Sequence, residues 1–327
     1  MNRRIAVASF FVAALLAQPV LAAEKVTFLL DWIPAGDSAT IYVAVQKGLF
    51  AAEGLDVTVQ SGRGSSDVIT KLATGTADMA TGGLAALLQA KAESNVPVTA
   101  VSSVYTTQPD AIFTTEGSGI NSLRDLVGKK VATATFSSSI VVWPLLLEAN
   151  AVDPTKVDVL KVDPGTLAPM LATGKVDAVI NWVTGAPAFD GPLSEAKKKL
   201  KLINWADHGF EGYGLSVFAS DRMLRERPAT VKKFLVAFNK AKEMAIADPS
   251  LAAASLKASL PETDLATAEK QWKAAIPLMV NDIEKKDGEG AFEPKRLATT
   301  WAWVAKSQHI PLDKFDPERA VDRSAMK

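Results

Sequence analysis

The stretch from residue 31 to residue 59, DWIPAGDSATIYVAVQKGLFAAEGLDVTV, restricts the possible fold most strongly, because its hydrophobic period changes within a short distance. Before it, residues 26–30 form a continuous apolar run, which is typical of a strand buried on both faces of a parallel sheet. Residues 41–48 then place apolar side chains on one face of a helix. Residues 55–59 alternate and predict a second strand. This order of strand, helix and strand is that of an α/β fold.

The turn between the first strand and the helix is polar and is flanked by aromatic residues. Asp37 or Ser38 is placed to cap the helix, and Trp32 and Tyr42 add aromatic surface. In open α/β sheets, ligands bind beyond the carboxyl ends of the strands, where helix N-termini offer unpaired N–H groups. We therefore expect this turn to border a ligand site, with Asp37 either facing the site or serving only as the N-cap.

A weak internal repeat indicates that the chain contains two similar halves. Residues 72–75, LATG, recur as residues 171–174, and Asp78 recurs as Asp177 at the same offset. Each copy follows a strand, a polar turn with glycine and a short helix, and each precedes another apolar strand. Because the same order of elements accompanies both copies, we predict two lobes that are built alike.

Two polar segments are the expected crossings between these lobes. Residues 105–110 contain a proline, and residues 209–214 are rich in glycine. We expect lobe 1 to comprise residues 24–107 plus 219–327, including the C-terminal helices, and lobe 2 to comprise residues 108–218. In each lobe a mostly parallel sheet would be flanked by helices. The double crossover would form a hinge that lets the lobes close on a solute.

The first 22 residues have the pattern of a secretory signal peptide. Arg3 and Arg4 precede an apolar run at residues 5–16, and small residues follow up to Ala22. The run is shorter than the ~20 residues that a membrane-spanning helix needs, and no Cys follows it to carry a lipid anchor. We expect cleavage after Ala22 and a periplasmic protein.

Composition excludes several other classes of protein. Without Arg3 and Arg4, the chain has 34 basic and 36 acidic residues. It therefore lacks the excess of basic residues that would indicate nucleic acid or anionic lipid as a partner. The chain has no Cys and two His, which excludes disulfides and thiolate metal sites and argues against a His-rich one. It lacks the motifs G-x-S-x-G and H-E-x-x-H and the kinase set. We expect a monomer without catalytic residues, metal or cofactor.

Three short motifs carry a resemblance to a known superfamily. DWIP at residues 31–34, GLF at 48–50 and EGLDV at 53–57 resemble the opening of the periplasmic binding proteins of the nitrate, sulfonate, taurine and thiamine-pyrimidine type. The resemblance extends over nearly the whole chain after residue 22. It implies the two-lobed fold of a type II periplasmic binding protein, and capture of a small solute for the permease and ATPase subunits of an inner-membrane ABC importer.

The same superfamily also contains thiamine pyrimidine synthases. The resemblance implies that such enzymes carry a cysteine-rich iron motif and use a Lys-bound pyridoxal phosphate with a nearby His. This chain has no Cys and carries an export signal. Both features disfavour that enzymatic activity, so we expect a binding protein.

The expected ligand site collects residues from turns of both lobes, namely Trp32, Asp37, Tyr42, Ser65, Gly83, Phe136, Ser137, Trp182 and Tyr213. The glycines could instead only form tight turns, and Trp182 could be a core residue. Pyrimidine-precursor binders typically show Asn and His after D-W-x-P, where this chain has AGDS at residues 35–38. If Asp37 faces the cleft, it favours a small planar nitrogen-containing solute such as a thiamine pyrimidine precursor. A sulfonate, nitrate or aromatic acid is the alternative.

Overall fold

The computed structural model describes residues 22–325. The predicted signal peptide therefore lies, apart from Ala22, outside the described residues. Within residues 22–325, no helix combines the length and the apolar character that crossing a membrane requires. The strands are Glu24–Leu29 (β1), Leu55–Gln60 (β2), Met79–Gly83 (β3), Val98–Ser103 (β4), Asp110–Thr115 (β5), Lys130–Ala134 (β6), Asp158–Val162 (β7), Ala178–Trp182 (β8), Leu200–Asn204 (β9) and Leu215–Ser220 (β10).

Helices separate most of these strands and make up most of the chain after β10. The α-helices are Ala39–Gln46 (α1), Leu49–Ala52 (α2), Ser65–Ala73 (α3), Leu84–Ser94 (α4), Ser139–Ala149 (α5), Leu167–Thr173 (α6), Asp190–Glu195 (α7), Asp221–Glu226 (α8), Pro228–Ala247 (α9), Pro249–Ser259 (α10), Leu265–Met279 (α11), Asp282–Asp287 (α12) and Pro294–Ser307 (α13).

The strands of the described chain form two five-stranded sheets with the same topology. Sheet A has the order β2-β1-β3-β10-β4, and sheet B has the order β7-β6-β8-β5-β9. In each sheet three neighbouring strands are parallel, and β10 or β5 runs antiparallel to both of its neighbours. Four strands of each sheet thus run in one direction. The predicted two-lobed α/β architecture is confirmed.

The internal repeat has a structural basis. Asp78 lies just before β3, and its carboxylate accepts a hydrogen bond of 2.9 Å from a backbone N–H of β1. Asp177 lies just before β8 and accepts a bond of 2.8 Å from the first N–H of β6. Gly75 and Gly174 follow α3 and α6 with φ of +78° and +74°, a conformation that favours glycine. The repeated residues therefore end a helix and anchor the next strand in both sheets.

The chain crosses between the sheets twice, and the two crossing segments lie against each other. The N–H groups of Val104 and Tyr105 both lie 2.9 Å from the carbonyl oxygen of Leu215, and the N–H of Gly214 donates to the carbonyl of Tyr105 at 2.9 Å. All of β10 pairs within sheet A. The boundary that we expected at residue 219 therefore falls inside a strand, and the chain has returned to sheet A by residue 215.

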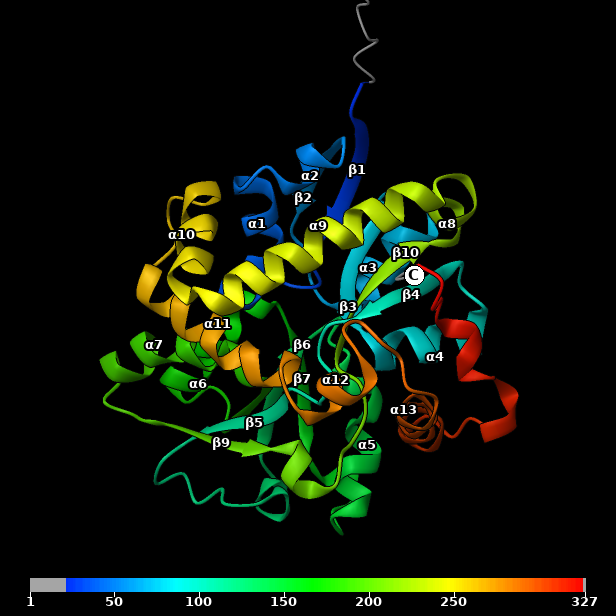
Figure 1. The fold of residues 1–327 in the computed structure, drawn as a ribbon. Coiled ribbons are helices and arrows are strands. Elements are labelled where there is room, and N and C mark those ends of the chain that lie inside the picture. Colours follow the sequence, from blue (N-terminus) through cyan, green and yellow to red (C-terminus); the bar gives the residue numbers. More distant parts are fainter. Residues whose placement is uncertain (1–21, 326–327) are drawn as a thin grey trace, which may run out of the picture.

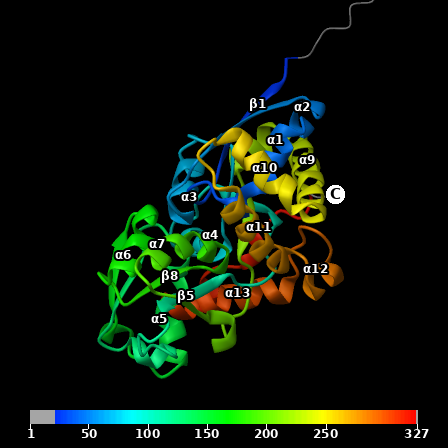
Figure 2. The same ribbon diagram turned by 90° about the vertical axis from the view of Figure 1, so that its left-hand side faces the viewer.

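Helices from the end of the chain connect the two sheets. Figure 1 shows α9 running past α1 toward α10 on the sheet A side. In Figure 2, α11 lies below α1 and α10, and α13 runs along the lower side of the molecule beside the green α5. Gln308, just after α13, accepts a hydrogen bond from Gln89 of α4 at 3.0 Å and donates one to the carbonyl of Val141 in α5 at 2.6 Å. The C-terminal helices thus contact both halves.

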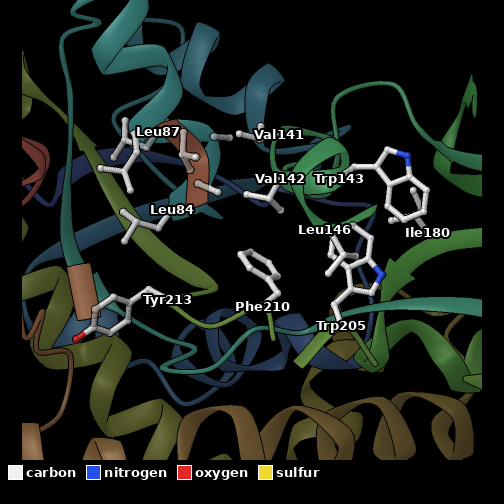
Figure 3. Close-up of a cluster of buried hydrophobic side chains, with 14 of the residues drawn as sticks. Leu84, Leu87, Val141, Val142, Trp143, Leu146, Ile180, Trp205, Phe210 and Tyr213 are labelled. Carbon is white, nitrogen blue, oxygen red and sulfur yellow. The ribbon is translucent and has the colours of Figure 1, made fainter. Parts of the chain in front are cut away.

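A buried hydrophobic cluster also joins helices of both sheets, and Figure 3 shows part of it. Leu84 and Leu87 come from α4, which follows β3 of sheet A. Val142 and Trp143 come from α5, which follows β6 of sheet B. The ring of Trp143 stacks on that of Trp205, with centroids 5.4 Å apart. Since apolar burial contributes about 25 cal/mol per Å², this shared core stabilises the contact between the two halves.

Candidate ligand-binding site

A cavity of about 340 Å³ lies between the two sheets, at the carboxyl ends of their parallel strands. Sheet A contributes residues that follow β1 and β2 and one residue of β3, and sheet B contributes residues that follow β6 and β7 and the end of β8. Open α/β sheets bind ligands at this edge. The volume is at the small end of the roughly 300–1,000 Å³ that ligand pockets occupy, which suits a small solute.

Five of the residues expected at the site border this cavity, namely Trp32, Asp37, Ser65, Ser137 and Trp182. Trp32 follows a strand of sheet A but packs against the core cluster of sheet B. Trp182 ends a strand of sheet B but packs against the core cluster of sheet A. The two indole rings therefore reach across the cavity in opposite directions. With this arrangement, the two indole rings could hold the planar ring of a solute between the two halves.

Two tyrosines that we expected at the cavity lie in the core instead. Tyr42 is 6% exposed and belongs to the core cluster of sheet A, because α1 turns Thr40 and Ile41 toward the cavity. Tyr213 is 1% exposed, and its hydroxyl oxygen accepts a hydrogen bond of 2.6 Å from the N–H of Glu293. In Figure 3 this hydroxyl points away from Phe210 and the rest of the cluster.

Gly83 and Phe136 also do not border the cavity, contrary to our expectation. The N–H of Gly83 is already bound by the hydroxyl oxygen of Ser65 at 2.9 Å, so it is not available to a ligand. The ring of Phe136 lies 5.9 Å from the guanidinium of Arg63, and the backbone carbonyl of Phe136 accepts a bond of 3.2 Å from Ser66. Phe136 thus contacts the opposite half, whereas the N–H of Gly83 is bound within its own half.

The polar turn after β1 directs Asp37 into the cavity. A short 3-10 helix, Gly36–Ser38 (η1), precedes α1, and no side chain caps α1. Ser38 occupies the N-cap position of α1, as expected, but its side chain makes no capping hydrogen bond. The hydroxyl of Ser38 instead donates to the carbonyl of Ala35 at 2.7 Å. The Asp37 carboxylate accepts a hydrogen bond of 2.6 Å from the hydroxyl of Thr184, on the opposite half.

Asp31 is a second acidic residue of the cavity, and the sequence analysis missed it as a site residue. Its carboxylate accepts a hydrogen bond of 3.1 Å from the hydroxyl of Thr81. Burial, with a smaller contribution from the charge of Asp37, raises the pKa of Asp31 to about 7. Burial also raises the pKa of Asp37, against the effect of its bond from Thr184. The sequence feature that could have identified Asp31 as a site residue is its position directly after an apolar strand.

Tyr105 was also missed, because we assigned it only to a crossing segment. It borders the cavity and is 1% exposed, and its hydroxyl has no hydrogen-bond partner among the described residues. Its ring meets Trp182 edge-on, with centroids 6.0 Å apart. Burial raises the pKa of Tyr105 well above its ordinary value, and the charges of Asp37 and Asp31 add to this effect. A buried hydroxyl without a partner marks a place where a ligand can supply one.

A chain of hydrogen bonds fixes the orientation of Trp182. The indole N–H of Trp182 donates to the carboxylate of Asp110 at 3.1 Å, and the hydroxyl of Ser139 donates to the same oxygen. Ser137, at the cavity wall, donates to Ser139 at 3.0 Å. Burial raises the pKa of Asp110 to about 6. Asp110 borders a separate cavity of about 10 Å³, which is about the size of one water molecule.

The charged residues that border the main cavity, among the described residues, are all acidic. Among the described residues that border it, none is Lys, Arg or His, and the acidic ones are Asp31 and Asp37. Arg63 lies next to the cavity-lining Gly64, but it pairs with Asp163 at 3.6 Å. Within residues 22–325, no group of three His, Cys, Asp or Glu side chains is arranged to hold a metal ion.

Comparison with known proteins identifies the family. The family model described as NMT1/THI5 like matches residues 35–252. The chain belongs to this family. A 4-amino-5-hydroxymethyl-2-methylpyrimidine phosphate synthase of Candida albicans is 30% identical over 322 residues, which cover 92% of this chain and 94% of the synthase. A formylaminopyrimidine-binding protein of Halalkalibacterium halodurans is 23% identical over 269 residues, which cover 82% of this chain and 80% of that protein.

A solved structure shows the same fold. The alkanesulfonate-binding protein SsuA of Xanthomonas axonopodis pv. citri, bound to MOPS, superposes with a TM-score of 0.72 at 18% identity, covering 92% of this chain and 100% of SsuA. This NMT1/THI5-like chain thus has the fold of a periplasmic binding protein, and the resemblance noted in its sequence is confirmed. Its relatives include both synthases and solute-binding proteins.

Proposed function

We propose that this protein is the solute-binding component of an ABC importer and captures a small planar nitrogen-containing solute, such as a thiamine pyrimidine precursor. The observation that carries the proposal is the composition of the cavity. Asp31, Trp32 and Asp37, which follow β1 of sheet A, and Trp182, which ends β8 of sheet B, border it. The described residues of its wall include no Lys, Arg or His. Such a wall offers stacking surface and hydrogen-bond acceptors to the solute.

The same cavity supports binding rather than synthesis. The synthase chemistry that the resemblance implies needs a Lys for pyridoxal phosphate, a nearby His and a cysteine-rich iron motif. The chain contains no Cys, and none of the described residues at the cavity is Lys or His. We infer that the protein releases its solute unchanged.

The two carboxylates favour a solute that donates N–H groups. One oxygen of Asp37 is bound by Thr184, and one oxygen of Asp31 is bound by Thr81. Backbone N–H groups of Asp37 and Ser38 also stabilise the charge of Asp37, and the backbone N–H of Asp31 that of Asp31. Each carboxylate has further lone pairs with which to accept a hydrogen bond from a solute. A sulfonate or a nitrate would face these negative charges without a basic partner, and like charges at close range oppose binding by several kcal/mol.

We infer that the solute is enclosed by two lobes, one built on sheet A and one built on sheet B, which open and close about the crossing segments. The signal-peptide pattern of residues 1–22 supports a location in the periplasm. There the monomeric protein would deliver its solute to permease and ATPase subunits in the inner membrane.

A thermal-shift screen tests this proposal. The purified protein is mixed with 4-amino-5-hydroxymethyl-2-methylpyrimidine, its 5-formylaminomethyl analogue, ethanesulfonate, nitrate and benzoate. We expect stabilisation by one or both pyrimidines and none by the anions. Stabilisation by the anions alone would contradict the assignment of the solute. A parallel incubation with iron and pyridoxal phosphate should form no pyrimidine phosphate, and its formation would show an enzyme.

A further inference from the structure

We propose that Asp31 and Asp37, together with the hydroxyl of Tyr105, make this cavity selective for a solute that carries a positive charge, such as an ammonium group on an aminopyrimidine. This inference rests on the proposed function and deepens it. It states the charge of the bound solute and names the residues that recognise this charge.

The first argument is that the two carboxylates lack a positive partner. Neither Asp31 nor Asp37 forms an ion pair with another described residue. Their direct side-chain partners, Thr81 and Thr184, are neutral hydroxyl groups. Burying a charge without an opposite charge is unfavourable. Because the described wall provides no Lys, Arg or His, these carboxylates either bind a proton in the empty cavity or are compensated by a positively charged solute, and such a solute gains the ion pairs that the protein lacks.

The buried hydroxyl of Tyr105 also favours a solute with several N–H donors. Tyr105 borders the same cavity as both carboxylates, and its hydroxyl has no hydrogen-bond partner among the described residues. Its oxygen can accept a hydrogen bond from a solute N–H, as the carboxylates do. A cationic group with several N–H donors would satisfy Tyr105, Asp31 and Asp37 together, whereas a single hydroxyl group has one hydrogen to donate.

The aromatic residues of the cavity wall also favour a positively charged solute. Trp32, Tyr105 and Trp182 border the cavity, and their rings carry negative potential on their faces. Cations are attracted to such faces electrostatically. Aromatic rings and carboxylates therefore favour the same sign of charge on the solute, and a neutral solute would gain from the rings but less from the acids.

Calorimetric titration with a matched pair of probes tests the proposal. The probes are 4-amino-2-methylpyrimidines with either an aminomethyl group, which is charged at pH 8, or a hydroxymethyl group, which is neutral. We expect the aminomethyl probe to bind about tenfold more tightly, since a charged hydrogen bond contributes about 1.5–3 kcal/mol. Asp31→Asn and Asp37→Asn should each reduce this ratio to about threefold or less.

Two further variants make the test specific. Tyr105→Phe removes only the hydroxyl and should weaken binding of the aminomethyl probe by about threefold. Asp313→Asn removes the same charge at an exposed position outside the cavity wall and should leave the ratio unchanged. Because neutral Asn relieves repulsion between buried like charges, the Asp31 and Asp37 variants should fold at least as stably as the native protein.

Equal affinities of the two probes for the native protein would overturn the inference, as would a ratio that survives in both cavity variants. If neither pyrimidine binds, the proposed solute is wrong. The preference for a charged solute is then tested by comparing the thermal shifts that benzylammonium and benzyl alcohol produce. Stabilisation by benzylammonium alone, lost in Asp37→Asn, would still support a cation site. No difference between these two probes would overturn it.

Discussion

The hydroxyl group of Thr184 donates a hydrogen bond of 2.6 Å to the carboxylate of Asp37. Asp37 lies in η1, which follows the first strand of sheet A, and Thr184 lies in the 3-10 helix Val183–Phe189 (η5), which follows a strand of sheet B. The bond therefore bridges the two halves at the cavity wall. Thr184 is 1% exposed, so the contact is shielded from solvent and depends on the position of one half relative to the other.

Replacing Thr184 by Val should weaken solute binding, because the closed form loses its hydrogen bond to Asp37. Hydrogen bonds to charged groups contribute about 1.5–3 kcal/mol, so we expect the dissociation constant measured by calorimetry to rise by about tenfold. Thr184→Ser is the matched control, since it keeps the hydroxyl group and should bind nearly as well as the native protein. Equal affinities of the Val and Ser variants would show that this bond does not contribute to closure.

Replacing Gly64 by Ala should hold the two halves apart. A Cβ atom at Gly64 would lie 2.3 Å from the carbonyl oxygen of Phe136, on the other half, and Gly64 has φ of +139°. We expect a larger radius of gyration in solution scattering and a loss of affinity of at least about tenfold. Gly117→Ala is the control, because Gly117 also has a positive φ, +78°, but faces open space. A compact Gly64→Ala variant with native affinity would contradict this contact.

The stability of the unliganded protein should fall as the pH rises from about 5 to 8. The folded state raises the pKa of Asp31 to about 7 and that of Asp110 to about 6, so it binds more protons than the unfolded state in this range. The resulting stability is present below the unfolded pKa near 4 and is lost as the pH passes the folded values. The groups that face Asp31 are Thr81, Asp37 and Tyr105.

Calorimetric melting at pH 5 and pH 8 measures this effect. Asp31→Asn removes a titrating group, so the drop in melting temperature between the two pH values should be smaller than in the native protein, by on the order of 2 °C or more. Asp313→Asn, which changes an exposed carboxyl, is expected to follow the native curve. An Asp31→Asn variant with an unchanged pH dependence would mean that Asp31 titrates normally in the folded protein.

Removing either indole from the cavity wall should reduce the affinity for a planar solute. Trp32 and Trp182 approach from opposite halves, and an aromatic pair contributes about 0.5–1.5 kcal/mol beyond its burial. Trp32→Ala and Trp182→Ala should therefore each raise the dissociation constant several-fold in fluorescence titrations. Trp303→Ala is the control, because Trp303 packs against Phe210 and does not border the cavity. Native affinity in both cavity variants would exclude a ring held between them.

The alternation and turn patterns of the sequence were sufficient to predict the strands and the similarity of the two halves. The repeat at residues 72–75 and 171–174 has the same role in both sheets, because it ends a helix and precedes an aspartate that anchors the next strand. Each aspartate bonds a strand that lies 51 or 47 positions earlier, but the motif that contains it is a short local pattern that occurs twice in the chain. Trp32 and Trp182 were also predicted to border the cavity, since each lies beyond the carboxyl end of an apolar strand.

The missed features depend on residues that are distant in sequence. Asp31 and Thr81 are 50 positions apart, and Asp37 and Thr184 are 147 apart, so no local pattern reveals these pairs. Tyr42 was misplaced because the sequence does not define which face of a short helix meets the cavity. Tyr105 was overlooked because the packing of two crossing segments, and not a motif, brings it to the wall.

The most direct test of the account is calorimetric titration of the purified protein with 4-amino-5-hydroxymethyl-2-methylpyrimidine and, separately, with ethanesulfonate. We predict that the pyrimidine binds with one site per chain, that ethanesulfonate gives no heat of binding, and that the pyrimidine is recovered unchanged after denaturation of the complex. Saturable binding of ethanesulfonate without binding of the pyrimidine would contradict the central claim that this acidic, aromatic cavity selects a nitrogen-containing solute.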